Sequence, residues 1–133
     1  MDSKKILVVE DDKVTQKLIS GALRSAGYQV FTAEDAATAM QIIRKEDPDL
    51  VSLDINLASL SPEDAWDGFT VGHWLRRLHE GEKGKPRPCV VVLSGLGPEK
   101  ILEKAAAIGA YTFLPKPFEK QKLLSIVAEA LKS

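Results

Sequence analysis

The chain has 133 residues, of which 44% are hydrophobic and 28% are charged, and its formal net charge is -1 at pH 7. This composition is typical of a folded, soluble protein rather than a disordered one. A net charge so close to zero supplies no general attraction to nucleic acid or to anionic lipid. The length fits one domain with a sizeable core, so we expect a single domain over residues 1–133, with a core from about 5 to 131 and without an output domain.

The amino-terminal segment and the cysteine content indicate a cytoplasmic protein. Only four strongly apolar residues, Ile6 to Val9, precede the first acids, which is too short for a signal-peptide core or a membrane span. Cys89 is the only cysteine, so no intramolecular disulfide can form, and its apolar neighbours predict a small core residue. We expect no membrane contact and no direct binding of nucleic acid.

Five short apolar runs predict the strands of a sheet. In chain order they cover residues 6–9, 28–32, 50–53, 89–93 and 111–114. The first, third and fourth runs are continuous rather than alternating, which is typical of strands covered by helices on both faces. Pro115 follows the last run and is tolerable there if that strand lies at an edge of the sheet, where a proline loses no ladder hydrogen bond.

Helical spacing of apolar residues fills the intervals between the runs. The predicted faces are Val14, Leu18, Ala22 and Ser25 in a first helix that ends near Gly27; Ala36, Ala39, Met40 and Ile43 in a second that stops before Pro48; Trp74, Leu75 and Leu78 in a third; Ile101, Leu102, Ala105 and Ile108 in a fourth that ends at Gly109; and Leu123, Leu124, Val127, Ala128 and Leu131 in a fifth. Such alternation predicts an α/β fold, a doubly wound parallel sheet of five strands flanked by five helices.

Polar side chains follow four of the runs, at the point where each strand ends. They are Glu10, Asp11 and Asp12 after the first run, Asp54 after the third, Ser94 after the fourth, and Lys116 with Pro117 after the fifth. Because the carboxyl ends of parallel strands share one edge of the sheet, we expect these residues to converge on one pocket. Carboxylates suit a divalent cation, and hydroxyl and ammonium groups suit phosphoryl oxygens. Taken alone, acids here could simply begin the next helix, which is the role we expect for Asp12 and Lys13.

This order of residues resembles the receiver domain of response regulators in two-component signalling, over nearly the whole chain. The resemblance implies the flavodoxin-like strand order 2-1-3-4-5 and a phosphoacceptor role for Asp54. It also implies Mg²⁺ bound by Glu10, Asp11, Asp54 and the backbone carbonyl of Asn56, with Asp11 as a direct ligand and Glu10 acting mainly through water.

The same resemblance assigns the phosphoryl-binding and switch residues. Ser94 is expected to donate a hydrogen bond to a phosphoryl oxygen, with Gly95 leaving room for the approach. Lys116 is expected to pair with another phosphoryl oxygen, and the peptide bond to Pro117 is expected to be cis. Phe113 stands at the position of an aromatic switch that is coupled to the serine, a packing change driven by local charge.

The implied function is a switch rather than an enzyme, assisting only its own phosphorylation and dephosphorylation. A sensor histidine kinase or a histidine phosphotransfer protein would phosphorylate Asp54. The face made by the fourth helix, the fifth strand and the fifth helix would then change its affinity for a downstream protein.

The chain departs from the usual receiver pattern after Asp54. Leu57 replaces the usual methionine and no proline follows it directly. Asp67-Gly68 comes about six residues late, so we expect the segment 57–66 to add a contact surface. Three alternative functions remain: a receiver fold that docks partners without phosphorylation, an aspartyl-phosphate phosphatase of haloacid-dehalogenase type, and a flavodoxin-like flavin protein. Asn56 replaces the second acid of the phosphatase motif, and the acids from Glu10 to Asp12 would repel a flavin phosphate.

Overall fold

The computed structural model describes residues 3–55, 75, 88–95, 105–106 and 109–132. The strands are β1 (Lys5–Val9), β2 (Gln29–Ala33), β3 (Leu50–Ile55), β4 (Cys89–Ser94) and β5 (Thr112–Pro115). The helices whose bounds are described are α1 (Lys13–Ser25), α2 (Ala36–Glu46) and α6 (Lys120–Lys132). Each strand lies within two residues of its predicted position.

The five strands form one parallel sheet in the order β2-β1-β3-β4-β5. This order confirms the expected doubly wound topology. It also places β5 at an edge, where Pro115 ends the ladder opposite Ser94. The longest ladder joins the central strand β3 to β4, from Leu50 opposite Cys89 to Ile55 opposite Ser94.

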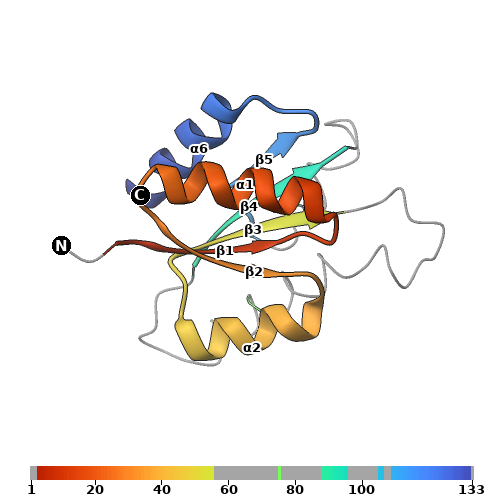
Figure 1. The fold of residues 1–133 in the computed structure, drawn as a ribbon, viewed down its shortest axis with the longest axis vertical. Coiled ribbons are helices and arrows are strands. Elements are labelled where there is room, and N and C mark those ends of the chain that lie inside the picture. The colour runs from red at the N-terminus through yellow and green to blue at the C-terminus, as the bar shows by residue number, and fades with distance from the viewer. Residues whose placement is uncertain (1–2, 56–74, 76–87, 96–104, 107–108, 133) are drawn as a thin grey trace.

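Helices cover both faces of the sheet, as the continuous apolar strands predict. In Figure 1, α1 and α6 lie above the sheet and α2 lies below it. One core, on the side of α1 and α6, joins strand residues such as Ile6 and Val8 to Ile19, Leu23 and Leu123. The other core, on the side of α2, includes Ala39 and Ile43 packed against Leu7, Val51 and Val92. Each strand therefore contributes alternate residues to two hydrophobic layers.

The predicted inner face of the first helix is wrong at Val14, Leu18 and Ser25, which are exposed, and right at Ala22, which is buried. Val14 is 67% exposed and Leu18 is 69% exposed, whereas Ile19 and Leu23 are almost fully buried. Apolar residues lie on more than one side of α1, and docking on the sheet selects the side that carries Ile19 and Leu23. The faces predicted for the second and last helices are confirmed, with Ala39 and Ile43 buried in α2 and with Leu123 and Val127 buried in α6.

Local sequence sets the ends of α1 and α2. Asp12 begins α1 as its N-cap, and its carboxylate accepts hydrogen bonds from the backbone N–H and the hydroxyl of Thr15. These bonds lower the pKa of Asp12. After α1 the chain turns at Gly27, whose φ is 98°. The second helix stops before Pro48, and Asp47 adopts the left-handed conformation (φ 52°) at its end.

Ser52 is a polar residue inside the core. It lies on the central strand β3 between Val8 of β1 and Val91 of β4, and it is 1% exposed. Its hydroxyl oxygen has no hydrogen-bond partner among the described residues. Within the described part of the chain, the centre of the sheet thus contains an unsatisfied polar atom, an uncommon feature in a folded protein.

Several predictions for the third and fourth helices fall outside the described residues. Trp74 and Leu78 of the third helix belong to this group, and so do Ile101, Leu102 and Ile108 of the fourth. Leu75 and Ala105, which are described, are both helical and buried. None of the described helices is long and apolar enough to cross a membrane.

Candidate functional site

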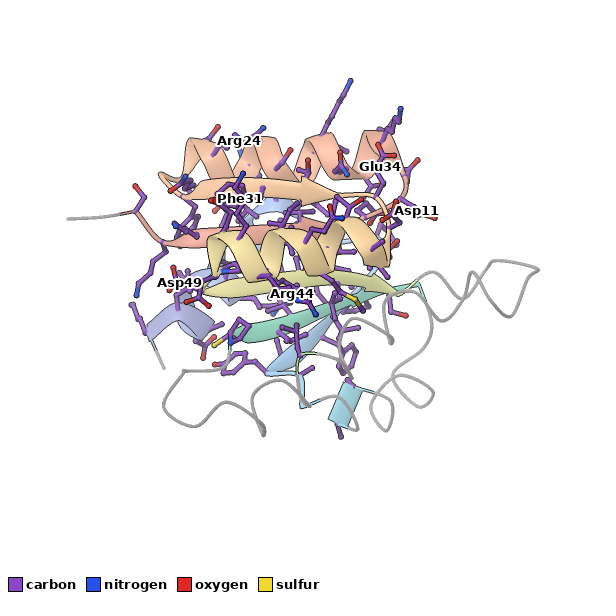
Figure 2. All side chains as sticks on the ribbon, turned by 90° about the horizontal axis from the view of Figure 1, so that it is seen from below. Asp11, Arg24, Phe31, Glu34, Arg44 and Asp49 are labelled. Atoms are coloured by element: carbon purple, nitrogen blue, oxygen red, sulfur yellow. The ribbon has the colours of Figure 1, made fainter. Side chains whose placement is uncertain are left out.

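The predicted polar residues do meet at the carboxyl edge of the sheet. Glu10 directly follows β1, Asp54 lies near the end of β3, Ser94 ends β4, and Lys116 directly follows β5. Figure 2 shows Asp11 at this end of the strands. Residues separated by up to 106 positions in the chain are therefore brought into contact by the order of the strands.

Lys116 is the centre of the hydrogen bonds at this edge. Its Nζ atom donates to Oδ1 of Asp54 at 2.6 Å and to Oε2 of Glu10 at 3.1 Å. The Glu10 and Asp54 side chains are only 1% and 5% exposed, whereas that of Lys116 is 27% exposed. Two nearly buried carboxylates thus share one ammonium group that still reaches solvent.

Glu10 is held on three sides. Its backbone N–H donates to the carbonyl of Ala33, its Oε1 atom accepts from the backbone N–H of Asp12, and its Oε2 atom accepts from Lys116. Burial, together with the hydrogen bond and negative charge of Asp54, raises the pKa of Glu10 from 4.5 to about 8. The charge of Lys116 and the Asp12 N–H act in the opposite direction but do not prevail.

Lys116 itself keeps its proton firmly. Burial lowers the pKa of Lys116, but the hydrogen bond and charge of Asp54, with those of Glu10, outweigh burial and leave it above its ordinary value. The ammonium is therefore positively charged throughout the physiological range.

Three carboxylates lie close enough to share a cation. Glu10, Asp11 and Asp54 each offer an oxygen atom, and these atoms all lie within 4.8 Å of one another. The Glu10 and Asp54 side chains are nearly buried and Asp11 is exposed, so the group opens to solvent on the side of Asp11. An all-oxygen donor set of this kind fits a hard divalent cation, and a dication would relieve the mutual repulsion of the acids.

The switch residues predicted from the resemblance lie beside this cluster. Ser94 is fully buried, and its carbonyl accepts a 2.7 Å hydrogen bond from the backbone N–H of Lys116. Phe113 pairs with Val92, two residues before Ser94, so the ring and the hydroxyl lie on the same face of the sheet. The peptide bond between Lys116 and Pro117 is cis, as expected.

Two further predicted residues have different outcomes. Gly95 is exposed, and a Cβ atom built there would meet no described atom within 4 Å, in keeping with the room expected beside Ser94. Asn56 lies outside the described residues, and so does the segment 57–66, so their roles stay predictions.

Sequence reasoning missed two features near the site. The first is the side-chain amide of Gln16, whose Nε2 atom donates to the carbonyl oxygen of Glu10 at 3.1 Å. No motif could have revealed this bond, because Gln16 lies within an ordinary helical pattern. The second is a groove of about 530 Å³ between α1 and α6. Its lining includes Leu18, Ile19, Lys116, Pro117, Phe118 and Lys120.

Comparison with known proteins agrees with this geometry. The family model described as the response regulator receiver domain matches residues 6–128. Chemotaxis protein CheY of Treponema pallidum is 33% identical over 131 residues, covering 96% of this chain and 83% of that protein. The DNA-binding transcriptional regulator NtrC of Rhizobium meliloti is 34% identical, covering 98% of this chain but only 25% of its own length.

A solved structure shares both the fold and the length. The crystal structure of a putative response regulator from Chloroflexus aurantiacus superimposes with a TM-score of 0.81 at 30% identity, covering 99% of this chain and 100% of that one. The sheet order, the clustered acids and the family match all agree. The chain belongs to the response regulator receiver domains, the phosphoacceptor domains of two-component signalling.

Proposed function

We propose that Asp54 is the phosphoacceptor and that it receives its phosphoryl group from a phosphohistidine of another protein. The observation that carries this proposal is the 2.6 Å contact between Asp54 Oδ1 and Lys116 Nζ beside a cluster of three carboxylates. One oxygen of Asp54 is held and oriented by an ammonium group. The other oxygen would attack phosphorus.

The transfer balances as a simple displacement. An Asp54 oxygen forms a bond to phosphorus while the bond between phosphorus and the imidazole nitrogen breaks, and the bonding electrons remain on the ring. The Lys116 ammonium and the Ser94 hydroxyl would stabilise charge on the phosphoryl oxygens. Bound Mg²⁺, held by Asp11, Asp54 and the nearby Glu10, would neutralise further charge on those oxygens.

The donor protein would dock in the groove between α1 and α6. Lys116 lines both this groove and the acidic cluster, so a protein seated there would bring its phosphohistidine to Asp54. Leu18 is exposed at the groove and supplies apolar contact area. Lys116 and Lys120 are the charged residues of its lining, which favours a donor helix with an apolar stripe and acidic flanks.

The downstream protein would bind another surface. The expected output face combines β5 and α6 with the fourth helix, most of which lies outside the described residues. Tyr111, just before β5, is 43% exposed and offers an aromatic contact there. We propose that Phe113 and Ser94 repack on phosphorylation and alter this face for a protein partner.

The test is incubation with acetyl phosphate and Mg²⁺, followed by intact mass spectrometry. We expect the wild-type protein to gain one phosphoryl group and Asp54→Asn to gain none. Asp49→Asn, which changes an exposed aspartate at the opposite end of β3, serves as the matched control and should be modified like the wild type. An unmodified wild type, or an equal adduct on Asp54→Asn, would refute the proposal.

A further inference from the structure

The side chain of Gln16 forms an unusual link between α1 and the acidic turn. Gln16 lies in the first turn of α1 and is half-buried, on the same side as the buried residues Ser20 and Leu23 at i+4 and i+7. An apolar residue would be the ordinary choice at this inward-facing position. The amide is instead directed to the carbonyl oxygen of Glu10, at 3.1 Å.

This contact acts on the backbone rather than on a carboxylate. The carbonyl of Glu10 belongs to the peptide unit that immediately precedes Asp11. The peptide unit that follows Asp11 is also held, because the Asp12 N–H donates to Oε1 of Glu10 at 3.1 Å. Both peptide planes that flank Asp11 are therefore fixed by side chains.

Gln16 also bonds the turn through its own backbone. Its N–H donates to the carbonyl of Asp12 at 2.9 Å, the first bond of the helical ladder. The side-chain and backbone bonds of one residue thus reach both neighbours of Asp11. Since the orientation of two peptide planes determines where the intervening Cα–Cβ bond points, Gln16 restricts the directions open to the Asp11 carboxylate.

We propose that Gln16 is a positioning residue for cation binding, which preorganises Asp11 by fixing the Glu10–Asp11 peptide. The inference rests on the proposed metal site and adds a residue that does not contact the cation itself. Asp11 is the exposed member of the cluster and packs least against the core, so it benefits most from a fixed backbone. Removing an outer partner of this type weakens metal affinity about tenfold or more in proteins.

The experiment compares Mg²⁺ binding by isothermal titration calorimetry in the wild type, Gln16→Met and Gln41→Met. Methionine matches glutamine in length and helix propensity but cannot donate the hydrogen bond. Gln41 is exposed on α2 and provides the matched control. We expect the Mg²⁺ dissociation constant to rise about tenfold in Gln16→Met and to stay unchanged in Gln41→Met.

Two further measurements separate positioning from simple stability. Urea unfolding without metal should show little change in Gln16→Met, because Asp12 still caps α1. Gln16→Asn keeps the amide but is one methylene shorter, so it should lose Mg²⁺ affinity like the methionine variant, and it also serves if Gln16→Met does not fold.

The inference and the proposed function fail in different ways. A dissociation constant within twofold of wild type in both Gln16 variants would overturn the positioning role while leaving the phosphoacceptor proposal intact. A wild type that binds no Mg²⁺ would overturn the metal site and the positioning role together.

Discussion

The two ends of the parallel strands differ in how their charged groups are paired. We call the end where the strands begin the amino edge and the end where they finish the carboxyl edge. At the amino edge, the Asp49 carboxylate accepts from the backbone N–H of Lys5 at 2.8 Å, and the N–H and carbonyl of Asp49 bond to Lys5 and Cys89. The Lys5 ammonium donates to the carbonyl of Glu46 at 3.2 Å. Figure 2 shows Asp49 at the opposite end of the strands from Asp11.

At the carboxyl edge the charges do not balance. The carboxylates of Glu10, Asp11 and Asp54 cluster together, and Lys116 contacts only Glu10 and Asp54 among them. The pKa of Glu10 rises to about 8 as a result of burial and the nearby Asp54. Hydrogen bonds at the amino edge join strands and stabilise the fold. At the carboxyl edge, three clustered carboxylates beside one ammonium group instead form a site suited to a cation and a phosphoryl group. Clustered charges and a shifted pKa thus distinguish the functional edge from the structural one.

The largest effect is expected for Lys116→Met, which removes the ammonium group that Glu10 and Asp54 share. The nearly buried Asp54 carboxylate would then lack a counter-charge, and we expect a loss of about 3 kcal/mol in the free energy of unfolding without metal. Phosphorylation by acetyl phosphate should fall at least about tenfold, because the phosphoryl oxygens lose a cationic partner. Urea unfolding and intact mass report the two effects.

Lys122→Met provides the matched control for this change, because Lys122 is exposed on α6. It should alter neither quantity. Equal behaviour of the two variants would contradict the central role of Lys116.

The second prediction concerns pH. The pKa of Glu10 is raised in the folded state, so the stability that its proton contributes is complete below the unfolded value of 4.5 and is lost as pH rises towards about 8. Without metal, the free energy of unfolding should therefore decline between about pH 5 and pH 8, by at most about 1.4 kcal/mol per pH unit. Urea titrations across this range measure the slope.

Glu10→Gln removes the titrating group and should flatten this decline. Added Mg²⁺ should stabilise the wild type more at the alkaline end of the range, because the cation competes with the proton of Glu10. An identical slope in wild type and Glu10→Gln would show that another group is responsible.

The third prediction separates docking of the donor protein in the groove from the phosphorylation of Asp54 itself. Leu18→Ala removes exposed apolar area beside Lys116 without opening the core, since Leu18 is 69% exposed. We expect transfer from a phosphohistidine protein to slow about three- to tenfold, in line with about 1 kcal/mol for an interface contact. Phosphorylation by acetyl phosphate, which needs no docking surface, should be unchanged, and a parallel loss with both donors would argue against the groove.

The smallest effect is expected at the amino edge. Asp49→Ala removes the carboxylate that accepts from the Lys5 N–H, and we expect a loss of about 1 kcal/mol in the free energy of unfolding. Mg²⁺ affinity should not change. Asp49→Asn keeps a hydrogen-bond acceptor and should retain most of the stability; a change in Mg²⁺ affinity in either variant would break the contrast between the two edges.

Local patterns explain why most of the fold was predictable. Continuous apolar runs located the strands, and Gly27, Pro48 and Asp12 marked helix boundaries within a few residues. The edge position of β5 followed from the strand order that the resemblance implies, and Pro115 is compatible with it. Each of these inferences depends on backbone conformation or burial, which a few neighbouring residues are sufficient to indicate.

Contacts between distant residues were harder to predict. The pattern put Val14 and Leu18 on the inner face of α1, but docking on the sheet buries Ile19 instead. The meeting of acids with Lys116 was expected from parallel topology, whereas the direct bond between Glu10 and Lys116 and the amide of Gln16 depend on side-chain reach. Such details require three-dimensional positions that spacing along a chain does not determine.

The buried hydroxyl of Ser52 lowers the thermal stability of this domain. Its oxygen lies in the middle of β3 without a partner among the residues that the structure describes, so replacing it with a hydrogen removes a desolvated dipole and little volume. Ser52→Ala should therefore raise the melting temperature. The Ser52→Ala variant would therefore be a more thermostable starting protein for biosensors or designed signalling circuits. The substitution lies two residues before Asp54 and changes none of the site residues.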